Sequence, residues 1–240
     1  MRIRAYCVLA LLAFGAAALL SQGAAVPISQ EHHHHLILSN SYVQVYEVEV
    51  PPHESTLLHQ HDYDYVYVVF GDADITNAVE GRPAVNSHLV DGTVNFVKGP
   101  LSHVARNNGD TPFRNITISL LHKQGDVETI YPSLKAGFDD TSYFDSWNDP
   151  RTIRGVTLFH TSETSVYGMQ IPSGETWTPE GDDAKLIVKL GKTFDGPGPK
   201  EKNAPSFPAN LLRWVPPGAK NFSITAGTKK ILLLVLEFND

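Results

Sequence analysis

The segment HQHDYDYVYVVFG, residues 59–71, decides how the rest of the chain is interpreted. It opens with two histidines one residue apart, His59 and His61, and continues as a run of valine and aromatic residues up to Gly71. Residues i and i+2 of a β-strand point to the same face of a sheet, so both imidazoles are expected on one side. The segment therefore predicts a strand that can offer two nitrogen ligands to one metal ion.

Short runs of similar composition recur along the chain. They are rich in valine, isoleucine, tyrosine and threonine, and glycine and proline separate them. The clearest runs lie at residues 43–50, 65–70, 94–97, 113–121, 186–190 and 231–238. Helical periodicity is scarce, so the sequence predicts an all-β protein with a sandwich or barrel architecture.

An internal repeat predicts two β domains in tandem. Residues 48–56 resemble residues 169–177, because in both segments a strand meets proline, then a turn, then glutamate. Residues 95–100 likewise resemble residues 213–218, and each copy ends in a strongly apolar strand. The expected organisation is a first domain at 26–132, an acidic, turn-rich linker at 133–150 and a second domain at 151–240.

The composition excludes several classes of function. The 240-residue chain has 19 basic and 26 acidic residues, which gives a formal net charge of -7. An acidic chain without a basic run is a poor partner for nucleic acid or for an anionic membrane surface. The single cysteine, Cys7, lies near the start of the chain, which excludes disulfides, iron–sulfur clusters and thiol nucleophiles from the mature fold.

The first 25 residues predict a secretory signal peptide. Arg2 and Arg4 form a short positive region, an apolar run follows at 5–20, and the segment 21–25, SQGAA, has small residues where a signal peptidase needs them. The apolar run falls short of the ~20 residues that span a bilayer, so stable membrane insertion is not expected. We therefore expect residues 1–25 to be removed and the mature protein to be periplasmic or secreted.

A third metal ligand would have to come from another strand. His103 is the leading candidate, because it follows a turn at 98–100 and precedes Asn107. Three protein nitrogens with an open coordination position are typical of catalytic or ligand-binding metal sites. Asp64 could add a carboxylate ligand or lie in a turn, and Tyr65 could instead direct its hydroxyl inward. No separate general base is evident, so Asp64 and Tyr65 are also the candidate catalytic residues.

These residues resemble the cupin family. Its first motif is Gly, five residues, His-x-His, three or four residues, Glu, six residues, Gly. His59, His61 and Gly71 match the motif, His53 stands where the leading glycine is usual, and Asp64 stands where the glutamate is usual. The loop before this position is shortened to two residues, and the substitution of aspartate for glutamate leaves the fourth ligand open.

The second cupin motif is also recognisable. It reads Gly, five residues, Pro-x-Gly, two residues, His, three residues, Asn. Gly92, His103 and Asn107 fall in register with it, whereas Lys98 and Pro100 replace the proline and the glycine. Two motifs in order make the resemblance fairly specific for residues 43–121.

The resemblance implies a bicupin, with two double-stranded β-helix barrels of the RmlC-like jelly-roll type in tandem. The first barrel would hold a divalent metal, Fe, Mn, Zn, Ni or Cu, through His59, His61 and His103. In the second copy Glu180, Asp182 and Asn221 replace the three histidines, which implies a degenerate barrel.

Several other residues have two readings. The tract at 32–35, four consecutive histidines, either collects metal weakly at the surface or starts a strand with one histidine lining the barrel mouth, and we favour the strand. Tyr63, Tyr65 and Tyr67 alternate and form either barrel core, which we favour, or an aromatic wall for a ligand. Arg106 and Arg114 are candidates to meet a substrate carboxylate, although Arg114 is equally suited to a structural salt bridge. For the two arginines and the tract, the choice between the two readings depends on the fold.

Three functions remain open at this point. The first is a metal-dependent small-molecule enzyme, dioxygenase- or isomerase-like as the resemblance implies. The second is a non-catalytic protein that binds or senses a small ligand or carbohydrate in a metal-anchored pocket. The third is a storage or structural bicupin. The sequence favours the first without deciding whether the protein is an enzyme, and its expected partners are a small molecule and, in a homodimer, a second copy of the chain.

Overall fold

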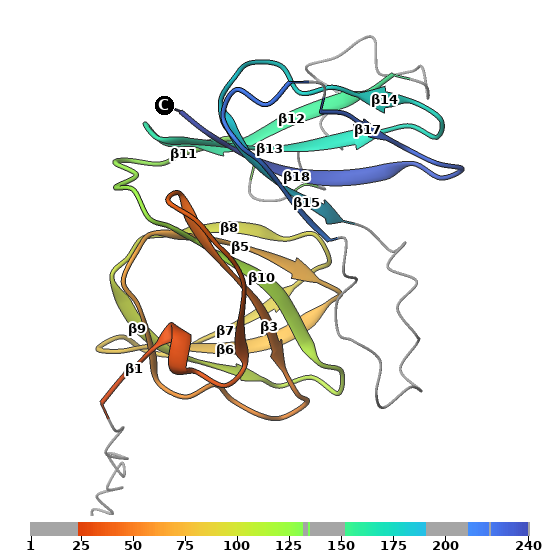
Figure 1. Ribbon diagram of the computed structural model, residues 1–240. Helices are drawn as coiled ribbons and strands as arrows, with labels where there is room; N and C mark the ends of the chain where they lie inside the picture. The colour runs from red at the N-terminus through yellow and green to blue at the C-terminus, as the bar shows by residue number, and fades with distance from the viewer. Residues whose placement is uncertain (1–23, 132–133, 135–151, 191–210, 221, 240) are drawn as a thin grey trace, which may run out of the picture.

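The computed structural model describes residues 24–131, 134, 152–190, 211–220 and 222–239. This part of the chain consists mainly of β-strands, with a short 3-10 helix, η1 (Ile28–Gln30), near its start (Figure 1). The six runs singled out in the sequence are all strands, which confirms the all-β prediction. Most of the predicted signal peptide and most of the predicted linker lie outside the described residues. Within the described residues, no helix has both the length and the hydropathy needed to cross a membrane.

The first half forms two five-stranded sheets that face each other (Figure 1). Its strands are β1 (Val26–Pro27), β2 (His34–Ser39), β3 (Val43–Val50), β4 (His59–His61), β5 (Tyr65–Phe70), β6 (Ala73–Val79), β7 (Val85–Leu89), β8 (Val94–Val97), β9 (Leu101–Asn107) and β10 (Phe113–Leu120). One sheet has the order β1-β4-β9-β6-β7 and the other has the order β2-β3-β10-β5-β8. Side chains from both sheets line a cavity between them.

The second half repeats part of this arrangement. Its strands are β11 (Glu128–Thr129), β12 (Arg154–His160), β13 (Thr164–Ile171), β14 (Thr176–Trp177), β15 (Ala184–Leu190), β16 (Leu212–Val215), β17 (Ile224–Thr225) and β18 (Ile231–Phe238). The larger sheet has the order β11-β12-β13-β18-β15-β16, and β14 pairs with β17 in a separate two-stranded sheet. Because β11 pairs with β12, the chain already joins the second half's sheet before the predicted domain boundary at residue 132.

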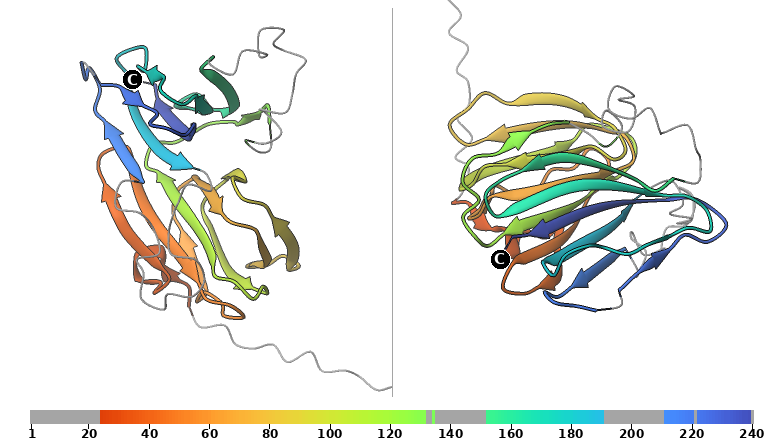
Figure 2. Two further views of the ribbon diagram at one scale, coloured as in Figure 1. Left: turned by 90° about the vertical axis from the view of Figure 1, so that its right-hand side faces the viewer. Right: turned by 90° about the horizontal axis from the view of Figure 1, so that it is seen from above.

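A shared apolar core joins the two halves, which lie one over the other (Figure 2). Strand β10 shows how the sequence builds it. Ile116 and Ile118 are fully buried in the shared core, whereas Asn115 and Thr117, on the opposite face of the strand, line the cavity of the first half. The strand thus alternates apolar residues that face the shared core with polar residues that face the cavity, the period-two pattern of a β-strand.

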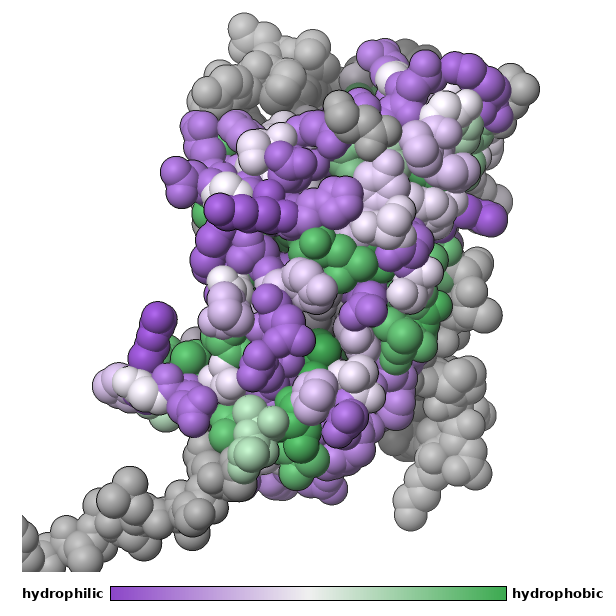
Figure 3. Space-filling model, turned by 60° about the vertical axis from the view of Figure 1, so that its left-hand side comes forward, coloured by the Kyte–Doolittle hydropathy of each residue, from purple (hydrophilic) through white to green (hydrophobic). Residues whose placement is uncertain are grey.

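The exterior of the first half also exposes apolar side chains. On the face in Figure 3, green apolar patches gather over the first half, and the second half is mainly hydrophilic. The exposed large apolar residues include Leu36 and Ile37 of β2, Leu57 just before β4 and Val85 of β7. The N-terminal segment thus adds apolar surface to the outside of the barrel.

Candidate metal centre

The register of two short strands brings the predicted histidines together. Strand β4 pairs antiparallel with β9, and in this pairing His59 lies opposite His103. His59 and His61 are buried on the same face of β4, while Gln60 between them is exposed, as the i, i+2 rule requires. The two cupin-like motifs therefore meet at one end of the cavity.

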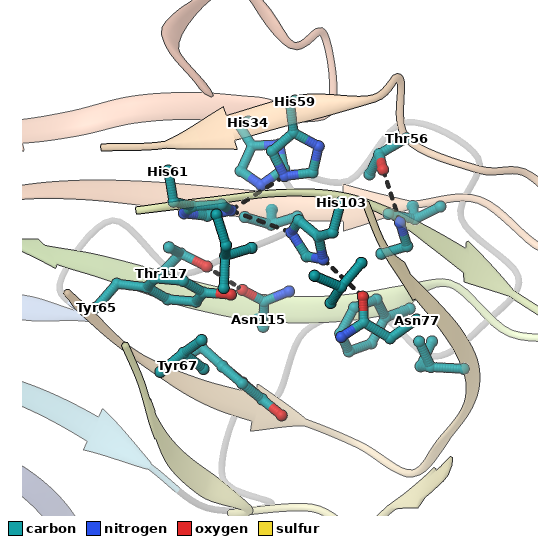
Figure 4. A pocket seen from close by; sticks show the side chains of 18 of the residues that line it. His34, Thr56, His59, His61, Tyr65, Tyr67, Asn77, His103, Asn115 and Thr117 are labelled. Atoms are coloured by element: carbon teal, nitrogen blue, oxygen red, sulfur yellow. Dashed lines mark hydrogen bonds between the residues drawn. The ribbon is translucent and has the colours of Figure 1, made fainter. Parts of the chain in front are cut away.

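The ring nitrogens of the three histidines converge (Figure 4). The distance between Nε2 of His59 and Nε2 of His61 is 3.1 Å, and the distance between Nε2 of His61 and Nε2 of His103 is also 3.1 Å. Ligands about 2.1 Å from one ion, at angles between 90° and 109°, lie about 3.0–3.4 Å apart. These two distances therefore fit ligands of a common divalent cation.

Hydrogen bonds on the outer side of two rings fix the direction of their lone pairs. Nδ1 of His59 donates to the carbonyl oxygen of Leu57 at 2.9 Å, and Nδ1 of His103 donates to Oδ1 of Asn77 at 2.7 Å. A neutral imidazole with its proton on Nδ1 has a lone pair on Nε2. His61 Nε2 thus faces two lone pairs and can donate to only one of them, whereas a cation would satisfy all three nitrogens.

Burial keeps these imidazoles in the form that binds metals. Burial, reinforced by His34, lowers the pKa of His59 to about 4, and burial, reinforced by His59, lowers the pKa of His103 to about 3. Burial lowers the pKa of His61 still further. The three rings are neutral at pH 7, so their lone pairs are available without loss of a proton.

A fourth histidine, His34, lies beside this group. It is the first residue of β2, is buried and lines the same cavity. Its ring centre lies 4.6 Å from that of His59 and 6.2 Å from that of His61. Its Nδ1 donates to Oε2 of the buried Glu31 at 2.6 Å. Of the two readings of the tract at 32–35, the structure has the strand start with one inward histidine.

The carboxylate of Asp64 is directed elsewhere. Its Oδ1 accepts a hydrogen bond from the amide of Gly99 at 2.8 Å, and its Oδ2 lies 3.0 Å from Nζ of Lys98. Asp64 is not among the described residues that line the cavity, so of the two readings left open by the sequence, metal ligand or turn residue, the structure has the turn residue. Its role is to hold the turn that precedes β9, and this role depends on a long-range contact that the motif comparison does not contain.

Tyr65 does face the cavity, but its chemistry differs from the expected one. Its ring stacks on that of His61, with centres 4.1 Å apart and planes 17° apart. Burial raises the pKa of Tyr65 well above its usual value, so the hydroxyl remains a neutral phenol and a poor general base. Tyr67 lines the cavity as well, whereas Tyr63 is exposed. Two of the three alternating tyrosines thus form an aromatic wall.

The cavity has a volume of about 420 Å³, which suits a small molecule. Apolar side chains form most of its walls, and the histidines occupy one end. Asn77, Asn115 and Thr117 contribute polar groups, and the side chains of Arg82 and Lys98 reach the lining. Among the described residues of the lining there is no aspartate or glutamate.

Arg106 and Arg114 do not line this cavity in the described structure. Nε of Arg114 lies 2.8 Å from Oε2 of Glu49 in an ion pair, the structural alternative that the sequence left open. Nη1 of Arg106 lies 3.5 Å from Oγ of Ser55. The cations of the lining come instead from turns whose approach to the cavity the sequence pattern does not reveal.

The residues that replace the histidines in the second half do not gather into a site within its described part. Asp182 pairs with Lys220 at 2.6 Å, and this hydrogen bond lowers the pKa of Asp182. Glu180 lines a separate surface hollow, and Asn221 lies outside the described residues. The two groups of potential metal ligands found in the described chain both lie in the first half.

No protein-family model and no curated protein matches the chain. Its fold does match solved structures. AerE from Microcystis aeruginosa shares 12% sequence identity, with 86% of this chain and 97% of that chain covered and a TM-score of 0.53. A salicylate 1,2-dioxygenase from Pseudaminobacter salicylatoxidans shares 10% identity, with 85% and 76% covered and a TM-score of 0.54. A cupin 2 conserved barrel domain protein from Leptotrichia buccalis shares 11% identity, with 86% and 88% covered and a TM-score of 0.48.

The chain is an all-β protein with histidines gathered at one end of a barrel cavity. Its fold is shared with AerE and the salicylate 1,2-dioxygenase, and it is the kind of all-β barrel that the cupin resemblance of the sequence implies. At 10–12% identity the likeness concerns the fold, and function has to be argued from the site.

Proposed function

We propose that the protein is an exported cupin that binds one divalent metal ion through His59, His61 and His103 and uses it to bind and transform a small molecule. The position of His61 Nε2, 3.1 Å from Nε2 of His59 and 3.1 Å from Nε2 of His103, carries this proposal. The export rests on the sequence of residues 1–25, and the reaction class we propose is dioxygenase- or isomerase-like. Fe, Mn, Ni, Cu and Zn all accept imidazole ligands of this kind.

The surroundings of the three histidines support this assignment. Leu57 and Asn77 orient two of the rings through Nδ1, and Tyr65 stacks on the third. Such outer contacts are what holds metal-binding imidazoles in place. A bound divalent ion would supply Lewis acidity or a site for oxygen activation, while the apolar walls of the cavity would exclude bulk water.

The structure also offers an observation in favour of binding without turnover. Proton transfer needs a group of suitable pKa near the substrate. The described lining has no carboxylate, Asp64 is committed to the turn at 98–99, and Tyr65 is a neutral phenol. A protein that binds or senses a small ligand through its metal is therefore the second candidate. The salicylate 1,2-dioxygenase among the fold matches makes oxidation of a small aromatic compound the first reaction to test.

The decisive experiment is metal analysis of mature protein purified without nickel affinity, because the tract at 32–35 would otherwise collect nickel. The protein is expected to carry about one equivalent of a divalent metal, and His103→Ala is expected to lower this to well below half. His88→Ala is the matched control, because His88 is exposed and pairs with Asp74 away from the cavity. Unchanged metal in His103→Ala, with loss of metal on deletion of residues 32–35, would overturn the assignment.

Activity then separates the two candidates. Turnover of a candidate substrate by the metal-loaded protein, lost in His103→Ala and kept in His88→Ala, would establish an enzyme. Tight ligand binding that needs the metal, without turnover of any of those substrates, would establish the binding protein.

A further inference from the structure

We propose that His34 is a fourth protein ligand of the same ion, and that the ion thereby fastens the N-terminal segment 26–39 across the edge of the barrel. This inference rests on the proposed function, because it requires an ion at His59, His61 and His103. It assigns a function to one histidine of the tract at 32–35 and replaces the carboxylate ligand once expected from Asp64.

The position of His34 carries the first step. A ligand nitrogen of His34 lies within 4.8 Å of the ligand nitrogens of both His59 and His61. Figure 4 shows its ring beside that of His59, at the end of the cavity where the other imidazoles meet. Its neighbour His33 is also buried and His35 is exposed, but of the four histidines of the tract only His34 is among the described residues that line the cavity. His34 would be the outermost of four imidazole ligands.

Glu31 supplies the second step, because it fixes the orientation of His34. The carboxylate accepts three hydrogen bonds: from Nδ1 of His34 at 2.6 Å, from the amide of His33 at 2.9 Å and from the amide of Leu57 at 3.1 Å. A ring whose Nδ1 proton is donated to Glu31 can offer the lone pair of its Nε2 to an ion. A carboxylate that holds the far nitrogen of an imidazole is the usual outer partner of a metal-binding histidine.

The charge of Glu31 points the same way. Glu31 is 1% exposed, and its ion-pair partners within the described residues are histidines, not lysine or arginine. A buried carboxylate without a nearby positive charge is costly. A divalent ion held by His34 would place a compensating charge one imidazole away.

The strand order gives the structural consequence. His34 begins β2, an edge strand of one sheet, whereas His59 and His103 lie on β4 and β9 of the other sheet. Two residue pairs of β1 with β4, Val26 with His59 and Pro27 with Gln60, join the start of the segment to that second sheet. Four-fold ligation would therefore link the two sheets where their edges approach, and metal binding would stabilise the N-terminal segment.

The test uses mature protein in which the exposed His32 and His35 are both serine, so that adventitious binding by the tract is removed. Metal-free protein is titrated with Cu²⁺, and pulsed electron paramagnetic resonance counts the coordinated imidazoles. His34→Ala is expected to raise the Kd for Cu²⁺ at least tenfold and to remove one imidazole from the count. Glu31→Gln is expected to raise the Kd several-fold with the count unchanged, and His88→Ala is expected to change neither.

Hydrogen exchange provides a readout independent of affinity. Cu²⁺ is expected to slow amide exchange in residues 34–39 of the parent protein and not in His34→Ala. Equal circular dichroism and equal exchange of the metal-free parent and variant would show that the fold is intact; if His34→Ala unfolds, His34→Gln takes its place.

The outcomes separate this inference from the proposed function. If His103→Ala abolishes binding while His34→Ala matches His88→Ala in affinity and imidazole count, the role of His34 is refuted and the three-histidine site stands. If neither variant affects Cu²⁺ binding, both proposals fail.

Discussion

His59 lies directly opposite His103 in the antiparallel pairing of β4 with β9. Directly paired residues of neighbouring strands have their side chains on the same face of the sheet, about 4.5–5.5 Å apart at Cβ. His61 shares that face because it lies two residues further along β4. The candidate metal centre is thus a property of strand register, and a one-residue slip of β4 would direct these side chains away from the cavity.

Asp64 is expected to stabilise the fold without holding the metal. Asp64→Ala removes the acceptor of the Gly99 amide and the partner of Lys98, and should lower the free energy of unfolding by about 1–3 kcal/mol. Lys98 is largely exposed, so most of the loss should come from the amide bond. Urea denaturation measures the loss, and elemental analysis of the folded variant should find unchanged metal. A variant that folds normally but loses its metal would restore Asp64 as a ligand.

The metal-free protein is expected to lose stability as the pH falls below 6.5. The folded pKa of His59 is about 4 and that of His103 about 3, against the usual 6.5 of an unfolded histidine. Between these pH values the unfolded state therefore binds more protons than the folded state. The free energy of unfolding keeps its full value above pH 6.5 and decreases as the pH is lowered from 6.5 toward the folded pKa values. Each histidine should contribute a loss of up to about 1.4 kcal/mol per pH unit.

Urea denaturation between pH 7.5 and 5 measures this slope. His59→Gln/His103→Gln, which lacks both titrating groups, should show a clearly shallower dependence than the parent in the same buffers. Parallel curves for the two proteins would show that these imidazoles are not neutral and buried in the folded state.

The internal repeat was recognisable because the two halves share one register. Val48 stands at the same position of the β3–β10 pairing as Met169 does in the β13–β18 pairing, which is the alignment that the sequence comparison proposed. Asn95 and Arg213 also correspond, opposite Tyr67 and Ile187. Proline, glycine and apolar alternation record strand ends and faces locally, so the chain reveals them.

The site was only partly predictable for a physical reason. His59, His61 and His103 are visible because strand spacing places two of them together and a motif supplies the third. The inward position of His34, by contrast, depends on Glu31 and on the pairing of β1 with β4, and the outward direction of Asp64 depends on Gly99. Such contacts between distant segments leave no periodic signal in a single sequence.

In the second half, Lys185 is expected to be a structural cation. Lys185 pairs with Glu237 in the second half as Tyr65 pairs with Ser119 in the first half. Lys185 therefore occupies the position that corresponds to Tyr65, the residue on which His61 stacks. Its side chain is 2% exposed, and its Nζ lies 3.2 Å from Oε1 of Glu237. Lys185→Met would leave this carboxylate uncompensated and should lower the free energy of unfolding by about 3 kcal/mol.

The double variant Lys185→Met/Glu237→Leu removes both charges and should recover most of that loss, measured by the same denaturation. Metal content should be that of the parent in both variants. A single variant as stable as the parent would mean that the buried ion pair contributes nothing.

The cavity is expected to prefer anionic ligands. Its described lining includes Arg82 and Lys98 and no carboxylate, and a divalent ion bound by neutral imidazoles would add further positive charge. Lys98 is already paired with Asp64, whereas Arg82 forms no ion pair within the described residues, so Arg82 is the cation free to meet a ligand.

Calorimetry should therefore find that benzoate binds the metal-loaded protein at least tenfold more tightly than benzamide, a neutral compound of similar shape. Arg82→Gln should remove most of this preference, whereas Arg106→Gln should retain it, because Arg106 is also exposed but lies outside the described lining. Equal affinities for the two compounds, or the same preference in Arg82→Gln, would show that Arg82 does not select the ligand.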